Sequence, residues 1–143
     1  MTHDRRLDEP SESYEGSIVT LAQKYGLAWA LDPDGSYVGG TDRKTDQHFL
    51  AWDRGQVVGI LKFRLHPGEL HLAHILVAPT HRLRHRAGKL LDRFLAWAER
   101  QNELAGFAVT CEISTSPHEQ VERMLTERGF EPAGREWRRT IGA

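Results

Sequence analysis

The chain has 143 residues, of which 39% are hydrophobic and 27% charged, a balance typical of an ordinary globular domain with enough apolar material for one core. Lys and Arg number 19 against 20 Asp and Glu, so the formal net charge of −1 gives no basic surplus of the kind that nucleic-acid or membrane binding usually needs. No apolar run approaches the roughly 20 residues that span a bilayer, and the single cysteine, Cys111, excludes an internal disulfide, so we expect a cytoplasmic protein.

The N-terminal part is predicted to contain a tail, a helix and a long loop. Residues 1–11 are polar and lack the apolar segment of a signal peptide, so we expect a flexible tail ahead of a single domain over residues 12–143. Apolar residues then recur at helical spacing, at Tyr14, Ile18, Leu21 and Tyr25. Gly26 is suited to end that helix. Residues 31–47 are rich in turn formers and predict a loop.

This loop is also acidic. It carries four aspartates, Asp32, Asp34, Asp42 and Asp46. Their charge either attracts a cationic amine or simply faces solvent, and the residues alone leave both interpretations open.

Three strands are expected next. Residues 48–52 and 56–65 flank Asp-Arg-Gly and predict a β-hairpin. A His-Pro-Gly-Glu turn leads into a third strand over residues 70–78, and Pro79 ends it because proline cannot donate to a ladder. The result is an antiparallel meander.

The C-terminal half alternates helices and strands. A helix begins near Ala87 or Gly88 and runs to about Asn102, with an apolar stripe of Leu90, Leu91, Phe94, Leu95 and Ala98. Residues 106–113 are continuously apolar, as in a buried strand paired in parallel. A capping box of Ser116 and Glu119 opens the next helix, whose inner face is Val121, Met124 and Leu125. Gly129 ends that helix, and residues 130–141 return as a last strand or hairpin. The sequence therefore predicts an α+β fold with a mixed sheet.

The turn between the third strand and its helix is strongly basic. It holds Arg82, Arg84, Arg86 and Lys89, and residues 81–89 include no acidic side chain. The first turn of a helix has backbone N–H groups without partners and carries partial positive charge, so an anion such as a phosphate would be favoured there. A solvated basic turn is about equally compatible with these residues. Nucleic acid is less favoured, because interleaved aromatic residues are missing.

The same segment resembles motif A of the GNAT acyltransferases. Val77, Pro79 and Arg82 match the family's pattern in type and spacing, and Ala87 takes its closing small-residue position. His85 stands where the family has its first glycine. By the order of elements, the resemblance extends over roughly residues 47–133, although the family's usual first strand is not recognisable before the predicted Tyr14 helix.

This resemblance implies a mixed, mostly antiparallel central sheet flanked by helices, with a splayed strand pair that holds acetyl-CoA as the acyl-donor substrate. The backbone N–H of Ile75 would polarise the acyl carbonyl, and Val77 would pair with the pantetheine arm. The pyrophosphate would lie against the loop and helix start formed by Arg82, Leu83, Arg84, His85, Arg86, Ala87, Gly88 and Lys89. Gly88 is expected to restore some of the flexibility that His85 removes.

The resemblance also places a general base at His71, where family members carry a glutamate or histidine. Simple strand alternation puts His71 and His74 on opposite faces, so they would not act together, and His74 is the reserve candidate. The family's usual tyrosine general acid is replaced by Leu125. Tyr37 from the loop is one substitute, and departure of the thiolate without help is another.

We therefore expect an N-acetyltransferase that acts on a primary amine, either a small molecule or a peptide or protein lysine, without a metal. The alternative is a catalytically silent CoA-binding regulatory or interaction domain of the same fold, as His85 and Leu125 suggest. An unrelated α+β protein whose basic turn binds nucleic acid is a third hypothesis. Domains of this kind often pair through sheet edges, so a homodimer is compatible with the sequence.

Overall fold

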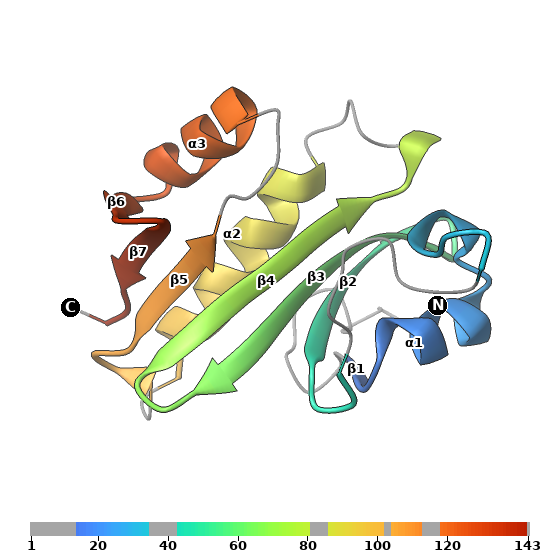
Figure 1. Cartoon of the computed structure of the whole chain (residues 1–143), viewed down its shortest axis with the longest axis horizontal. Helices are drawn as coiled ribbons and strands as arrows, with labels where there is room; N and C mark the ends of the chain where they lie inside the picture. Colours follow the sequence, from blue (N-terminus) through green and yellow to red (C-terminus); the bar gives the residue numbers. More distant parts are fainter. Residues whose placement is uncertain (1–13, 35–42, 81–85, 102–103, 113–117, 143) are drawn as a thin grey trace.

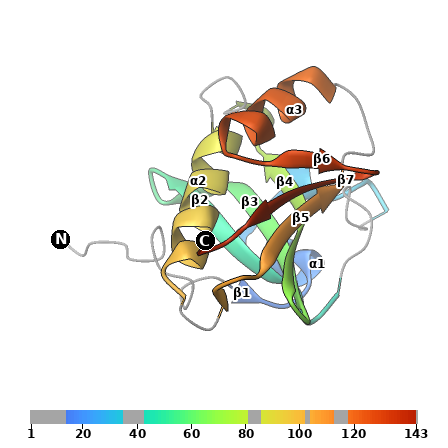
Figure 2. The ribbon, with the colours of Figure 1, turned by 90° about the vertical axis from the view of Figure 1, so that its left-hand side faces the viewer.

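A computed structural model describes residues 14–34, 43–80, 86–101, 104–112 and 118–142. One sheet of seven strands organises them, in the spatial order β1-β2-β3-β4-β5-β7-β6. Helix α1 lies on one face of this sheet and α2 on the other, as the two perpendicular views show (Figures 1 and 2). Among the described residues, no helix has the length and apolar character needed to cross a bilayer.

The N-terminal segment begins with a strand rather than with the predicted helix. Strand β1 (Tyr14–Glu15) pairs antiparallel with β2, Tyr14 opposite His48, so the first strand that the sequence did not reveal is present but very short. Gly16 has φ 144° and breaks the helical periodicity that Tyr14 had suggested. Helix α1 (Ile18–Tyr25) therefore starts later, after Ser17, whose hydroxyl accepts a hydrogen bond from Thr20 N at 3.1 Å.

The end of this segment agrees with the prediction. Gly26 adopts φ 69° and closes α1 by donating its N–H to Ala22. A short 3-10 helix, η3 (Ala28–Ala30), follows and was not predicted.

The antiparallel meander is confirmed. Strands β2 (Gln47–Asp53) and β3 (Gln56–His66) form a hairpin whose turn residues, Arg54 and Gly55, have φ 51° and 80°. Positive φ at both central positions is the geometry that matches the twist of the flanking strands. Strand β4 (Glu69–Val77) follows through a tight turn and pairs antiparallel with β3.

The C-terminal half is also as predicted in type and order. Helix α2 (Arg86–Glu99) leads to β5 (Ala108–Glu112), which is parallel to β4, and then come α3 (His118–Glu127), β6 (Glu131–Ala133) and β7 (Glu136–Thr140). The last two strands form a hairpin, with β7 antiparallel to β5. Helix α2 ends before the expected Asn102 because Arg100 and Gln101 donate to carbonyls three residues back, which tightens the last turn. The predicted N-cap residue Ser116 lies outside the described residues, as does the side chain of Glu119.

Two apolar cores lie on the two faces of the sheet. The larger core packs α2 and α3 against the sheet and includes the whole predicted stripe of Leu90, Leu91, Phe94, Leu95 and Ala98, together with Cys111. The smaller core lies under α1, around Ile18, Leu21, Leu50 and Ile60. Cys111 is therefore a core thiol.

Candidate active site

Strands β4 and β5 stop pairing about halfway along β4. Their parallel ladder runs from Glu69 opposite Ala108 to Leu72 opposite Cys111 and is not continued in the described residues. The ladder with β3 on the other side goes on to Val77 opposite Gly59. Figure 1 shows β4 running on beyond the end of β5. The splayed pair that the resemblance implied is thus a feature of this sheet.

A β-bulge in β4 lies at the point of divergence. Leu72 pairs with Phe63 and His74 pairs with Lys62, so Ala73 is an extra residue on β4. A bulge bends its strand and increases the local twist. Because Leu72 is also the last β4 residue that pairs with β5, the bend explains why β4 leaves β5 there and remains attached to β3.

The bulge also corrects the predicted alternation. His71 lies opposite Arg64 and His74 opposite Lys62, and these two β3 residues are two positions apart and contact the same carboxylate. Directly opposed residues of neighbouring strands share a face of the sheet. His71 and His74 therefore lie on the same face, the one that bears α1, and the expectation that they occupy opposite faces is wrong.

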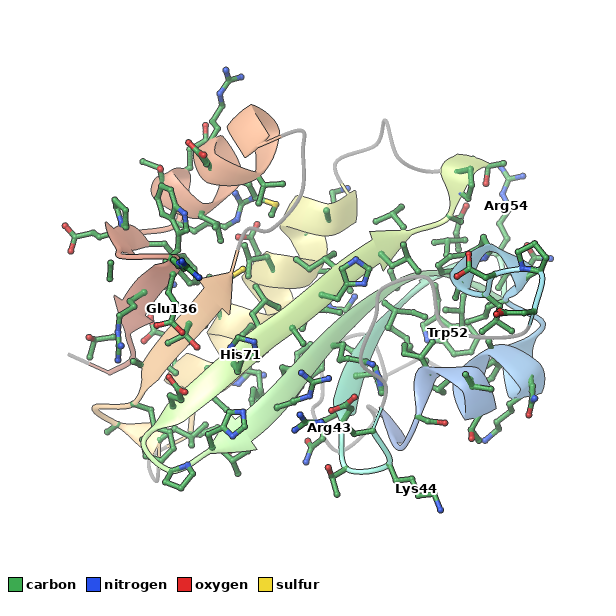
Figure 3. The ribbon with its side chains drawn as sticks, in the orientation of Figure 1. Arg43, Lys44, Trp52, Arg54, His71 and Glu136 are labelled. Carbon is green, nitrogen blue, oxygen red and sulfur yellow. The ribbon has the colours of Figure 1, made fainter. Side chains whose placement is uncertain are left out.

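His71 is held by the neighbouring strand. Its Nδ1 lies 3.1 Å from the hydroxyl of Thr110, which is completely buried and sits directly opposite it on β5. The ring of His66 lies 6.1 Å from that of His71, centroid to centroid. Figure 3 shows His71 on β4, in front of the sheet, with α2 behind. The candidate base is thus half-buried and oriented at the start of the splay.

A buried ion cluster lies on the same face. The carboxylate of Asp46 contacts Lys62 Nζ at 3.0 Å and Arg64 Nε at 2.6 Å, and it accepts the backbone N–H of Arg43 at 2.9 Å. Burial by itself raises the pKa of Asp46, but the hydrogen bonds from Arg64, Arg43 and Lys62 outweigh it and lower the pKa below its ordinary value. The Asp46 carboxylate is therefore neither solvated nor available to attract an amine, because it is buried and paired with Lys62 and Arg64 inside the protein.

His74 stands beside this cluster. Burial, and then the positive charge of Lys62 across the strand pair, lower the pKa of His74 below its usual value. The ring is consequently neutral at pH 7, and its conjugate acid is a stronger acid than that of an ordinary histidine. As a proton acceptor it is weaker than a solvated imidazole.

The predicted cofactor residues fall into two groups. Ile75 lies opposite Leu61, three residues after the last β5 pair, and Val77 is buried opposite Gly59 at the end of β4. Ala87, Gly88 and Lys89 belong to the first turns of α2. Residues Arg82, Leu83, Arg84 and His85, the side chain of Arg86, and Tyr37 lie outside what the structure describes.

Two predicted positions have packing roles. A Cβ on Gly88 would lie 2.7 Å from Nη2 of Arg128, which also binds Asp92 through Nε at 2.7 Å, so the glycine makes room for a side chain from the end of α3. Leu125 is fully buried in the larger core. It therefore contributes to packing, and nothing at that position can protonate a thiolate.

Two hollows lie near these elements. One of about 380 Å³ adjoins the end of β4 and is lined by Tyr25, Trp29, Trp52 and Pro79 among others. The other, of about 430 Å³, lies between α2, α3 and β7 and is crossed by the pairs of Arg128 with Asp92 and Arg139 with Glu99. Neither is lined by His71 or Ile75. The described residues contain no group of three His, Cys, Asp or Glu side chains arranged to hold a metal ion.

Thr110, the bulge at Ala73 and the Asp46 cluster were not predicted from the sequence. A faint signal existed, because Thr110 is the one hydroxyl in the apolar run 106–113, and Lys62 and Arg64 share a face of the strand and interrupt its apolar residues. All four buried polar side chains of the described residues lie on the His71 face or at its edge, namely Asp46, His48, Lys62 and Thr110.

Comparison with known proteins decides the family. A model of the acetyltransferase (GNAT) family matches residues 7–130, most of the chain. The chain belongs to this family. N-acetylation with acetyl-CoA is the general activity of GNAT proteins. A search of curated protein sequences found no match.

Solved structures of GNAT proteins share the fold. An acetyltransferase of the GNAT family from Staphylococcus aureus Mu50 is 16% identical, with 90% of this chain and 96% of that chain covered at a TM-score of 0.59. An acyl-CoA N-acyltransferase from Pseudomonas aeruginosa is 20% identical, with 86% and 88% covered at a TM-score of 0.57. At these identities the likeness establishes the GNAT fold.

Proposed function

We propose that this GNAT protein is an N-acetyltransferase that moves an acetyl group from acetyl-CoA to a primary amine by direct attack. The observation that carries the proposal is the divergence of β4 from β5 at the Ala73 bulge, with a hydrogen-bonded histidine at its base. The acceptor is a small amine or a peptide or protein lysine, and residues 12–143 act as one domain.

The donor would enter where β4 has left β5. Past Leu72 the strand ladder of β4 continues with β3, and an extended pantetheine arm would run along the opposite edge, from which β5 has diverged. The backbone N–H of Ile75 would hydrogen-bond the acyl oxygen and stabilise the negative charge that develops there. The start of α2 and the basic residues from Arg82 to Lys89 would hold the pyrophosphate.

His71 would act as the general base. It removes a proton from the ammonium or attacking amine, directly or through a water molecule, so that the nitrogen lone pair can attack the thioester carbon. Collapse of the tetrahedral intermediate breaks the C–S bond. The thiolate leaves without protonation by the residue at position 125, since Leu125 is buried and apolar.

The same features support a second candidate, a CoA-binding domain without turnover. Leu125 in place of the family's tyrosine and His85 in place of its glycine favour that alternative. Titration calorimetry with acetyl-CoA tests both candidates, and absence of binding at millimolar ligand would contradict both. A thiol-release assay against small amines, peptides and lysine-bearing proteins then separates them, because only the enzyme releases CoA in an acceptor-dependent manner.

A further inference from the structure

Thr110 is a buried polar residue for which the mechanism above has no use. Its exposed fraction is 0%, although its neighbours Val109 and Cys111 point into the larger core on the other face. A buried hydroxyl without a hydrogen bond costs about 1–3 kcal/mol, so such a side chain is normally satisfied. The described partner of the Thr110 hydroxyl is Nδ1 of His71, at 3.1 Å.

The place of this contact in the sheet is specific. His71 and Thr110 face each other in the parallel ladder, and the next pair, Leu72 and Cys111, is the last before the strands diverge. His71 and Thr110 are therefore the final cross-strand pair on the α1 face. Beyond them the bulge at Ala73 turns β4 away from β5. A hydrogen bond at this position fixes the imidazole at the vertex of the splay.

We propose that Thr110 is a positioning residue for His71: its Oγ1 accepts the Nδ1–H of the ring and so holds His71 in the tautomer whose lone pair is on Nε2. This inference rests on the proposed function, in which His71 takes the amine proton. Nε2 gains that proton, Nδ1 keeps its own, and the resulting imidazolium still donates to Oγ1. The tautomer of a histidine is set in this way by the hydrogen bond that its other nitrogen makes.

Several ionisable groups share this face with His71. Charged or titratable side chains that share this face around His71 include Lys62, Arg64 and His66 on β3, Glu69 and His74 on β4, and Arg138 on β7, with Asp46 bound to Lys62 and Arg64. Arg64 is bound to Asp46 through both Nε and Nη2, and His66 meets His71 through ring contact. Thr110, by contrast, places its hydroxyl at hydrogen-bond distance from Nδ1.

The test compares three variants of the full chain. Thr110→Val keeps the shape and removes the acceptor, whereas Thr110→Ser keeps the hydroxyl. Thr140→Val makes the same change at an exposed position of β7, the strand beyond β5, and is the matched control. Nitrogen-15 NMR of the His71 ring reports which nitrogen carries the proton, and it does so whether or not the protein turns over.

We expect a protonated Nδ1 in the wild type, in Thr110→Ser and in Thr140→Val, and loss of that preference in Thr110→Val. With an amine acceptor, kcat should fall about 3- to 10-fold in Thr110→Val, the equivalent of one neutral hydrogen bond. KM for acetyl-CoA should not change, and the pH profile of kcat should shift, because the His71 cation loses a partner. Thr110→Ser should restore both.

A wild-type ring protonated on Nε2 would overturn the inference, and so would an unaltered tautomer in Thr110→Val. Failure of the proposed function is a separate result. If no amine is acetylated, or if His71→Ala retains full activity, the assignment of the base fails, while the NMR experiment still decides whether Thr110 sets the tautomer.

Discussion

The α1 face of β4 carries two histidines in unlike surroundings. His71 is half-buried and hydrogen-bonded to a neutral hydroxyl, whereas burial, and then the opposing Lys62, lower the pKa of His74. A general base works best when its conjugate acid has a pKa near the working pH. The lowered pKa of His74 makes it the weaker base of the two candidates, which supports His71 as the proposed base.

His71→Ala tests this assignment. We expect turnover to fall by about 10²- to 10⁴-fold, the usual contribution of a general base, with the affinity for acetyl-CoA nearly intact because His71 lies outside the basic segment that we propose to hold the pyrophosphate. Steady-state thiol release and calorimetry measure the two quantities separately. An unchanged rate across pH would exclude the role, and a parallel loss of affinity would indicate a structural role instead.

The lowered pKa of His74 predicts how the stability of the fold depends on pH. Its pKa is lowered in the folded protein, so below about pH 6.5 the unfolded chain binds a proton that the folded chain resists. Stability should therefore fall as the pH drops from 7 to 5, by up to about 1.4 kcal/mol per pH unit from this one group. In His74→Gln, urea unfolding at several pH values should give a shallower decline.

Protonation of Asp46 does not affect the comparison between pH 7 and 5. Its pKa is lowered below its ordinary value, so the stability it contributes is present above that value and is lost only when more acidic conditions protonate the folded protein. Equal declines between pH 7 and 5 in the wild type and in His74→Gln would contradict the assignment to His74.

At the scale of elements, two glycines differ in what surrounds them. A Cβ on Gly59 of β3 would lie 3.0 Å from Leu90 Cδ1 and 3.3 Å from the Cβ of Ala51, both buried in the core under α2. A Cβ on Gly88 of α2 would meet the end of the flexible Arg128 side chain. An added methyl group at Gly59 would require the core to repack, whereas at Gly88 the Arg128 side chain can move aside.

We therefore expect Gly59→Ala to lower the free energy of unfolding by about 1–3 kcal/mol, as overpacking does. Gly88→Ala should be nearly neutral, because the gain of about 1 kcal/mol in helix propensity offsets a weakened surface pair between Arg128 and Asp92. Urea denaturation of the two variants measures the difference. A more damaging substitution at Gly88 would show that the α2–α3 contact depends on Arg128.

The turn between β4 and α2 gives a prediction about the donor. Arg82→Glu should weaken acetyl-CoA binding about 10- to 100-fold, as expected when a charge-assisted hydrogen bond is replaced by repulsion. Arg100→Glu introduces the same charge change at an exposed position just beyond α2, and it should have little effect. Calorimetry at fixed ionic strength measures both. Equal losses would point to nonspecific attraction rather than to a defined anion site.

At the scale of the whole molecule, the two faces of the sheet differ in the polarity of their buried side chains. The α2 face holds the larger apolar core, while the α1 face holds the buried polar groups in a band from Asp46 to Thr110. Partly exposed charged residues continue that band onto β7 at Arg138. The α1 face thus carries the buried charges and the candidate base beside its smaller apolar core.

The sequence by itself determined most of the elements and their order, although not β1 or η3. Patterns only a few residues long predicted the apolar stripe of α2, the hairpin turn before Gln56 and the glycine that ends α1. Short-range sterics and burial are enough to determine such features. The basic turn after Pro79 is equally local, and its residue pattern was enough to suggest the GNAT family. Tyr14 was wrongly assigned to the first helix, because its helical spacing continued across Gly16, whereas it lies in β1.

Only the tertiary structure decided how the site is assembled. His71 and Thr110 are 39 residues apart, and Asp46 meets Arg64 across 18. Such contacts depend on which strands pair and in which register, and no local pattern encodes that. The extra residue at Ala73 shows the consequence, because a one-residue bulge moved His74 to the face of His71 and opened the sheet there. The sequence shows which residue types are present, but the long-range pairing of the strands determines which side chains come into contact.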